Sequence, residues 1–277
     1  MLMRHAVSTV SITAISLNLL FWFVPLLATA VVQFLARTDR VHRFCHQMAE
    51  WIYRSAAGFD NFWLGRVLGI DVRVYGDAPD RRDRSLIVVS NHRSWFDILV
   101  LQGVIVSRGP MLKFLIKREL VWVPIVGWIC LALSFPRLVR GKSVDGRLAD
   151  YEAVATASAD LKRAPAALMN FAEGTRFSPE KRDRSGADYQ YTLNPRSGGL
   201  RIMLETLPEA DILDATLVYP DEDISFWRCL SGDIRTIEVD LATFRAQDVG
   251  DVNDWLRQRW LEKEKRIRNH HAPVPLV

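Results

Sequence analysis

The chain has 277 residues, enough for one or two domains with a sizeable buried core. Its net charge of +4 and pI near 9.1 give no indication of a nucleic-acid partner. They suit an anionic membrane surface or a phosphorylated substrate better. The three cysteines, at positions 45, 130 and 229, are too few and too scattered for a disulfide framework or a zinc site, which fits a reducing compartment.

The amino end is apolar and carries no Asp, Glu, Lys or Arg from Ala6 to Ala36. This run is long enough for one tilted membrane span, or for a helical hairpin bent at Pro25. Four arginines follow between residues 37 and 54, whereas only Arg4 precedes the run. The positive-inside rule therefore predicts that the rest of the chain faces the cytoplasm. We divide the sequence into a membrane segment, 1–40, and a catalytic domain, 41–277.

Strands alternate with helices along the remainder of the chain. The patterns predict helices at 41–68, from 94 onward, 150–161 and 251–268, and strands at 71–75, 85–90, 131–135, 166–171, 214–219 and 235–241. The last helix carries an aromatic stripe that should pack on the core, opposite a heavily charged side. This order predicts an α/β fold with a central, mostly parallel or mixed sheet flanked by helices, behind an N-terminal membrane helix or helical hairpin.

An uncharged apolar stretch from Leu120 to Phe135 is too short for an easy membrane span. One interpretation makes it a buried helix followed by a strand. The other makes it an apolar wall that receives acyl chains or dips into the surface of a bilayer. The two interpretations are compatible.

A histidine and a carboxylate, His92 and Asp97, lie five residues apart where a buried strand meets a helix. Five helical residues turn about 500°, so the pair can meet only if His92 lies in the loop and Asp97 in the first helical turn. Ser94 is a candidate N-cap, with Asp97 three residues later as in a capping box. Asp97 could therefore serve only as a cap. Alternatively, it holds His92 as a general base.

A second group of candidates runs from Phe171 to Arg176 at the end of a predicted strand, where ligands of α/β sheets usually bind. Gly174 lets the backbone approach an anion, Thr175 offers a hydroxyl and Arg176 can grip a phosphate. A solvated turn is the alternative. Lys117 and Arg137 flank the apolar stretch, where they suit a ligand with a charged head and an apolar tail, or are ordinary charges near a membrane.

These blocks resemble the motifs of the glycerolipid acyltransferases, specifically the 1-acylglycerol-3-phosphate O-acyltransferases (lysophosphatidic acid acyltransferases) and their lysophospholipid relatives. Residues 91–97 are similar to the family's His-x4-Asp motif, and 117–137 to the blocks around its second motif. Residues 171–176 are similar to its Phe-Pro-Glu-Gly-Thr-Arg motif, with Ala172 in place of proline. Tyr219 lies where the fourth motif is expected, and its substrate contacts stay open.

The resemblance implies transfer of a fatty acyl group from a thioester, acyl-CoA or acyl-carrier protein, to the sn-2 hydroxyl of lysophosphatidic acid. It makes His92 and Asp97 the catalytic pair. The implied phosphate-binding residues are Lys117, Arg137, Glu173, Gly174, Thr175 and Arg176. Among these, Glu173 is expected to organise the loop, because its own charge repels a phosphate.

No metal ion or cofactor is expected beyond the acyl donor, which is a substrate. The expected partners are the two substrates and membrane lipid. A membrane-anchored bacterial branch of the family is the best match, which implies the inner (cytoplasmic) membrane. The alternatives are another lysophospholipid acceptor, thioester hydrolysis, or a non-catalytic membrane protein that binds lipid.

Overall fold

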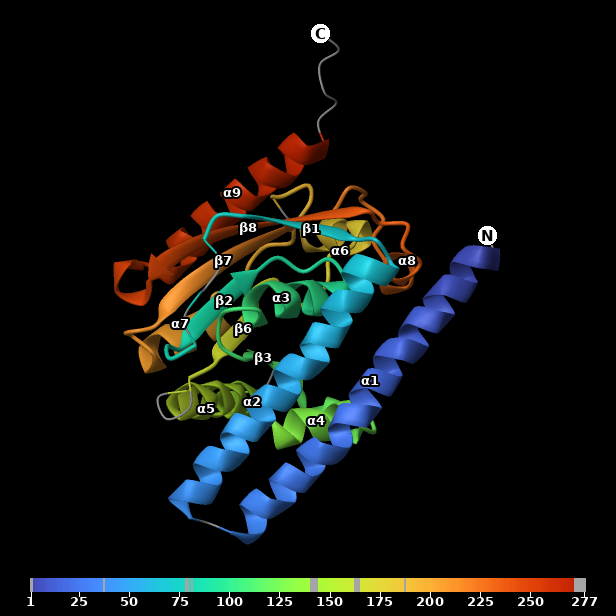
Figure 1. Ribbon diagram of the computed structural model, residues 1–277. Coiled ribbons are helices and arrows are strands. Elements are labelled where there is room, and N and C mark those ends of the chain that lie inside the picture. Colours follow the sequence, from blue (N-terminus) through green and yellow to red (C-terminus); the bar gives the residue numbers. More distant parts are fainter. Residues whose placement is uncertain are drawn as a thin grey trace.

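The structure, a computed structural model, describes residues 2–36, 38–77, 80, 82–139, 144–161, 165–186 and 188–271. Arg37, one of the four arginines after the apolar run, lies outside the described residues. The chain forms a central sheet with helices on both faces, and a long helical hairpin lies along one side (Figure 1). The predicted α/β class is confirmed.

Six strands make the main sheet, in the order β1 (Asp71–Tyr75), β8 (Thr236–Arg245), β7 (Asp211–Val218), β2 (Leu86–Ser90), β6 (Ala167–Phe171) and β3 (Leu112–Phe114). Every neighbouring pair is parallel except β7 with β8. The carboxyl ends of β7, β2, β6 and β3 therefore meet at one edge. Ser90 pairs with both Phe171 and Ala215, so β7 continues beyond the end of β2. The sheet is mixed, as the prediction allowed.

The central strand β2 is buried on both faces, which explains its unbroken apolar sequence. Val88 belongs to the core shared with α2 (Asp39–Phe62) and α3 (Phe96–Val106). Ile87 and Val89 belong to the core on the other face, which α7 (Gly198–Thr206) and α9 (Val252–His271) cover. Alternate residues of one strand therefore build two cores. α5 (Val144–Leu161) completes the second face.

The amino-terminal helix α1 (Leu2–Leu35) passes through Pro25 without a break. The hairpin is therefore formed by α1 and the following helix, and the predicted bend at Pro25 is wrong. α1 is the one helix in the described part of the chain that is long and apolar enough to cross a membrane. Its first turns contact the rest of the protein near α8 (Phe226–Leu230): Ser8 Oγ donates to the carbonyl of Trp227 at 2.9 Å, and Arg4 pairs with Asp233 at 3.2 Å.

The second helix of the hairpin attaches α1 to the sheet. α2 begins after Thr38, whose side chain accepts from the backbone N–H of Val41, and continues into the π-helical turn η1 (Trp63–Val67). The predicted helix over 41–68 matches these two elements. Tyr53 donates its hydroxyl to the carbonyl of Leu112 at 2.8 Å, which fastens α2 beside β3. The domain boundary at residue 40 stays a prediction.

The apolar stretch forms a 3₁₀ turn, η2 (Arg118–Trp122), and a helix, α4 (Val126–Ala132). The predicted strand over 131–135 is therefore wrong, because short apolar runs do not separate strands from helices. A Cβ on Gly127 would lie 2.4 Å from the carbonyl oxygen of Leu120, so only glycine allows η2 and α4 to pack this closely. Trp122 is 84% exposed and Trp128 48% exposed. Part of the stretch thus presents large apolar side chains to its surroundings.

The other predicted strands and helices are confirmed, with shifted ends. On α9, Leu256 and Trp260 are buried as the aromatic stripe predicts. The prediction that the charged side chains of α9 lie opposite the core is only partly right, because Lys263 and Glu264 are also buried. The sequence patterns did not indicate β3, α7, α8 or α6 (Pro179–Ser185), nor the two-stranded sheet of β4 (Ile116–Lys117) and β5 (Arg137–Leu138).

Candidate active site

The candidate residues gather at the edge where β2, β6 and β7 end. His92 follows β2, the loop from Phe171 to Arg176 follows β6, and Tyr219 directly follows β7. The backbone N–H of Phe177 donates to the carbonyl of His92 at 2.8 Å, so the first two loops are hydrogen-bonded to each other. Two motifs that lie about 80 residues apart in sequence thus share one site, as parallel strand ends predict.

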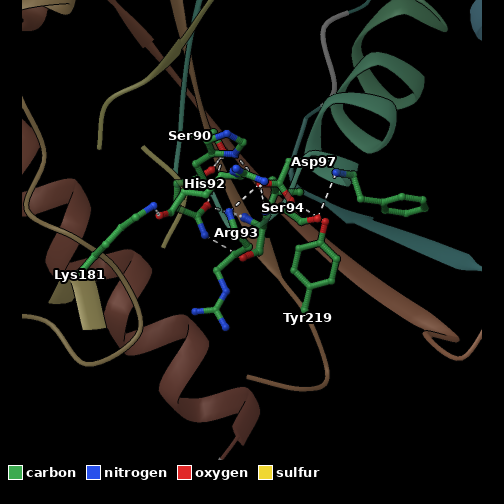
Figure 2. Close-up of polar contacts among 11 residues, drawn as sticks. Ser90, His92, Arg93, Ser94, Asp97, Lys181 and Tyr219 are labelled. Carbon is green, nitrogen blue, oxygen red and sulfur yellow. Dashed lines mark hydrogen bonds and ion pairs between the residues drawn. The ribbon is translucent and has the colours of Figure 1, made fainter. Parts of the chain in front are cut away.

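Asp97 lies at the centre of this site and is fully buried. Its Oδ2 accepts from His92 Nδ1 at 2.8 Å, and from the backbone N–H groups of Arg93 and Ser94 at 2.6 and 3.0 Å (Figure 2). Its Oδ1 accepts from the hydroxyl of Tyr219 at 2.6 Å. The carboxylate therefore binds four donors. Because His92 uses Nδ1 for this contact, Nε2 is the ring nitrogen left for a substrate.

The same carboxylate also caps the helix. α3 begins at Phe96, one residue later than a Ser94 cap would place it. The hydroxyl of Ser94 accepts from the backbone N–H of Phe96 at 3.2 Å, while Asp97 accepts the N–H of Ser94. This pattern is similar to a capping box, except that the hydroxyl accepts from the second residue after Ser94 rather than the third. The two interpretations of Asp97 are both compatible with the geometry, since one carboxylate contacts His92 and the helix start together.

The imidazole of His92 is held between aromatic rings. It stacks on Phe171 with ring centroids 3.8 Å apart, and Trp95 meets its edge at 6.4 Å. Asn91 fixes the backbone beside it: its amide donates to the carbonyl of Leu217 and accepts from the N–H of the same residue, both at 2.9 Å. Asn91 thus continues the pairing of β2 with β7 beyond the end of β2. These contacts leave the imidazole little freedom to rotate.

Arg93 stabilises the surrounding loops. Its guanidinium donates to the carbonyls of Tyr191 and Glu222, both at 2.8 Å, and lies over the ring of Phe177 at 4.4 Å. Burial lowers the pKa of Arg93, an effect that the charge of Glu173 opposes. The role of Arg93 was not predictable from the sequence, because nothing local distinguishes a buried arginine from a solvated one.

The loop after β6 places a cation over Trp95, a ring that also contacts His92. The guanidinium of Arg176 lies 4.9 Å from the ring centroid of Trp95, the same ring that meets His92. Thr175 accepts from Lys181 Nζ at 2.9 Å, and Lys181 also donates to the carbonyl of Arg176 at 2.8 Å. Lys181, on α6, therefore holds this loop in shape. Lys181 lies outside the motif, so its role was not predicted from the sequence.

Two other residues of this loop, Gly174 and Glu173, have distinctive surroundings. Gly174 has φ +70°, a conformation that suits glycine, and its N–H donates to the carbonyl of Phe171 at 2.9 Å. That N–H closes a turn, so Gly174 contributes shape to the loop. Glu173 is 2% exposed, and burial raises the pKa of its carboxyl well above the usual range, against the opposing effect of Arg93. A buried carboxyl is poorly placed to contact a phosphate, and the place of Glu173 among the phosphate-binding residues stays a prediction.

Lys117 and Arg137 lie on the neighbouring strands β4 and β5, and both are exposed. Their part in phosphate binding stays a prediction. Within the described part of the chain, no group of three or more His, Cys, Asp or Glu side chains is placed to hold a metal ion.

Comparison with known proteins identifies the family. The model of the acyltransferase family matches residues 71–220, more than half of the chain and the segment that contains the sheet edge described above. The chain belongs to the acyltransferase family. As a member of this glycerolipid acyltransferase family, it is an enzyme that transfers acyl groups.

Among its relatives, lysocardiolipin acyltransferase 1 from Danio rerio is 28% identical over 91% of this chain and 66% of that protein. The protein of the same name from Gallus gallus is 27% identical over 90% of this chain and 67% of that protein. This acyltransferase thus spans about two thirds of the length of these relatives. The crystal structure of the 1-acyl-sn-glycerophosphate (LPA) acyltransferase PlsC from Thermotoga maritima shares the fold, with a TM-score of 0.52 and 18% identity over 93% of this chain and 99% of that one.

Proposed function

We propose that this acyltransferase moves a fatty acyl group from an acyl thioester to the sn-2 hydroxyl of lysophosphatidic acid. The observation that carries the proposal is the contact between His92 Nδ1 and Asp97, which leaves Nε2 as a base for a substrate hydroxyl. A thioester is already activated, so a direct attack needs no covalent acyl-enzyme. The acyl donor, acyl-CoA or acyl-carrier protein, is a substrate, and we expect no metal ion or cofactor.

In the proposed reaction, His92 Nε2 takes the proton of the acceptor hydroxyl as its oxygen bonds to the thioester carbonyl carbon. The tetrahedral intermediate then collapses, the C–S bond breaks, and the proton passes from the imidazolium to the thiolate. Asp97 holds the tautomer and stabilises the imidazolium between the two steps. General-base catalysis of this kind is worth about 10²–10⁴-fold in rate, and positioning of the two substrates must supply much of the rest.

The acceptor phosphate is assigned to Arg176. Its guanidinium lies over Trp95, next to the imidazole, so one lysolipid could place its hydroxyl at His92 and its phosphate at Arg176. Lys181 would keep that loop in place through Thr175. Ring contacts of Phe171, Phe114 and Phe135 connect His92 with the apolar stretch, and we propose that the apolar part of a substrate lies on this side of the site.

Another lysophospholipid is the alternative acceptor. The relatives named lysocardiolipin acyltransferase 1 favour it, since that acceptor is a phosphodiester. Arginine can bind a phosphodiester as well as a phosphomonoester, so Arg176 is compatible with both.

We further propose that the protein belongs to a bacterial branch and lies on the cytoplasmic face of the inner membrane. α1 presents exposed apolar side chains, and α4 adds Trp128, whose ring lies 5.8 Å from that of Phe23 on α1. Both ends of the hairpin return to the catalytic domain, because Arg4 and Ser8 at the start of α1 contact it directly (Figure 1). This arrangement favours a hairpin whose apolar face enters one leaflet over a helix that crosses the bilayer.

Labelling with a membrane-impermeant maleimide tests this placement. Leu2→Cys lies at the start of α1 and Asp39→Cys at the start of α2, both on exposed positions. The proposal expects both to react only in inverted inner-membrane vesicles. Reaction of either residue from the outside of intact spheroplasts would contradict it.

The test of the reaction is acyl transfer by the purified full chain in detergent or lipid. The acceptors are lysophosphatidic acid, lysophosphatidylglycerol and lysocardiolipin, each with acyl-CoA and acyl-carrier protein as donors. We expect the highest turnover on lysophosphatidic acid and none with His92→Ala. Equal or better turnover on another acceptor would refute the preference for lysophosphatidic acid. Thiol release without any lysolipid, or no transfer at all, would refute lysophospholipid acylation.

A further inference from the structure

We infer that Tyr219 is a positioning residue of the catalytic pair, so that the working unit is His92, Asp97 and Tyr219. The inference rests on the proposed function of His92 and Asp97 and adds a third member to them. Its basis is the 2.6 Å hydrogen bond from the Tyr219 hydroxyl to Asp97 Oδ1 (Figure 2).

The location of Tyr219 is set by the sheet. β7 ends at Val218, three residues beyond the residue that pairs with the end of β2. This extra length carries Tyr219 past the start of the β2 loop, to the carboxylate at the first turn of α3. The ring is 2% exposed and belongs to the same core as Phe96, Cys229 and Leu230. Packing of this kind fixes the position of the hydroxyl.

The two oxygens of Asp97 then have separate tasks. Oδ2 accepts three donors, including His92 Nδ1, whereas Oδ1 accepts only the Tyr219 hydroxyl among the hydrogen bonds of the described residues. A donor on Oδ1 prevents the carboxylate from rotating and draws negative charge away from Oδ2. Tyr219 therefore orients the carboxylate. It also limits how far the negative charge of Asp97 stabilises the protonated form of His92.

Tyr219 remains a donor throughout the useful pH range. Burial, and then the charge of Asp97, raise the pKa of Tyr219 well above its usual value. The other ionisable groups that face the pair are Arg93 on the same loop, Glu173 after β6 and Cys229 on α8. Burial raises the pKa of the Cys229 thiol to about 12, so this thiol stays neutral.

Removing only the hydroxyl tests the inference. With Tyr219→Phe, more of the negative charge of Asp97 lies on Oδ2, the oxygen that contacts His92. The imidazolium is then stabilised, so the neutral imidazole is available as a base only at higher pH. We expect the acidic limb of the pH profile of kcat/KM to move up by about 0.3–1 pH unit, and kcat to fall by about 5- to 30-fold, with KM for donor and acceptor unchanged. The assay uses whichever acceptor the parent protein acylates best, so failure of the lysophosphatidic acid proposal leaves this test intact.

Tyr53→Phe is the matched control. Tyr53, on α2, is also buried and also donates its hydroxyl at 2.8 Å, but its acceptor is the backbone carbonyl of Leu112 on β3. It should lose stability as Tyr219→Phe does and leave the pH profile in place. An equal shift of the acidic limb in both variants would overturn the inference.

A second substitution provides an independent test if Tyr219→Phe folds poorly. Incorporation of 3-fluorotyrosine at position 219 keeps the shape of the ring and makes its hydroxyl a stronger donor. We expect the acidic limb to move down, opposite to its shift in Tyr219→Phe. Thermal unfolding of each variant reports folding separately. If the limb stays in place for both substitutions, or moves in the same direction for both, Tyr219 has only a packing role.

Discussion

Replacing Asp97 by asparagine and by alanine separates its two tasks, capping and orientation. Asparagine can place its amide oxygen where Oδ2 accepts three donors, and its NH₂ group where Oδ1 faces the Tyr219 hydroxyl. That hydroxyl can rotate from donor to acceptor. Every buried polar group in Asp97→Asn therefore keeps a partner, while the charge is lost. Alanine leaves the same donors without an acceptor.

The magnitudes follow from this count of partners. Each buried donor without an acceptor costs about 1–3 kcal/mol, and entry of water recovers part of that, so Asp97→Ala should lose about 3–5 kcal/mol of stability. Asp97→Asn converts charge-assisted hydrogen bonds to neutral ones and should lose about 1–2 kcal/mol. Its kcat should nevertheless fall by about 10²–10⁴-fold, because the imidazolium loses its counter-charge.

The assay pairs thermal or denaturant unfolding with acyl transfer, both on the full chain in the same detergent. Ser94→Ala serves as the control, since it removes a hydroxyl from the capping box and leaves the contact of His92 with Asp97 in place. It should cost about 1 kcal/mol of stability and little activity. The reasoning is refuted if Asp97→Asn is as unstable as Asp97→Ala, or if it retains activity close to that of the parent.

Three further predictions concern the loops around the pair. Arg176→Ala should raise KM for a phosphate-bearing acceptor by about 10-fold or more, with a smaller effect on KM for the donor. Arg176→Lys should recover only part of the lost acceptor binding. Steady-state kinetics with both substrates would measure these changes. Glu264→Ala removes the acceptor for the N–H groups of Gln190 and Tyr191 and should lower the free energy of unfolding in denaturant by about 2–4 kcal/mol. Glu264→Gln keeps one oxygen and should lower it by less. Equal losses would contradict the role of Glu264 as the acceptor for these N–H groups. Burial raises the pKa of Glu173 above its ordinary value of 4.5. The stability that its bound proton provides is therefore complete below pH 4.5 and is lost as the pH rises. The unfolding free energy of Glu173→Gln should increase relative to that of the parent from about pH 5 to about pH 8, and a difference that does not change with pH would refute this.

Local geometry made much of the site predictable. The interval between His92 and Asp97 allowed a contact only with the histidine in a loop and the carboxylate in the first helical turn, and the structure has that arrangement. The loop from Phe171 to Arg176 was expected at the same edge, because parallel strands end together. In both cases a short segment and one rule of fold geometry were sufficient.

The supporting residues could not be predicted in this way. Tyr219 and Asp97 lie 122 positions apart, and Arg93 and Tyr191 lie 98 apart. Such contacts depend on the order of strands in the sheet, which alternation of helices and strands does not specify. The strand expected over 131–135 failed for a different reason: apolar composition fits a helix and a strand equally well, and the close approach at Gly127 decided for the helix.

Helix α9 lies outside the segment that matches the family model, yet it takes part in building the site. Glu264 accepts from the backbone N–H groups of Gln190 and Tyr191 and from the hydroxyl of Thr192. The carbonyl of Tyr191 in turn accepts from Arg93, the neighbour of His92. The adjacent Lys263 is also buried, paired with Asp214 at 2.5 Å. Burying two neighbouring charges costs solvation energy, and apolar residues there would pack without that cost. An apolar residue at position 264 could not accept the N–H groups of the loop, however, so Glu264 fixes the position of the loop in a way that packing alone would not.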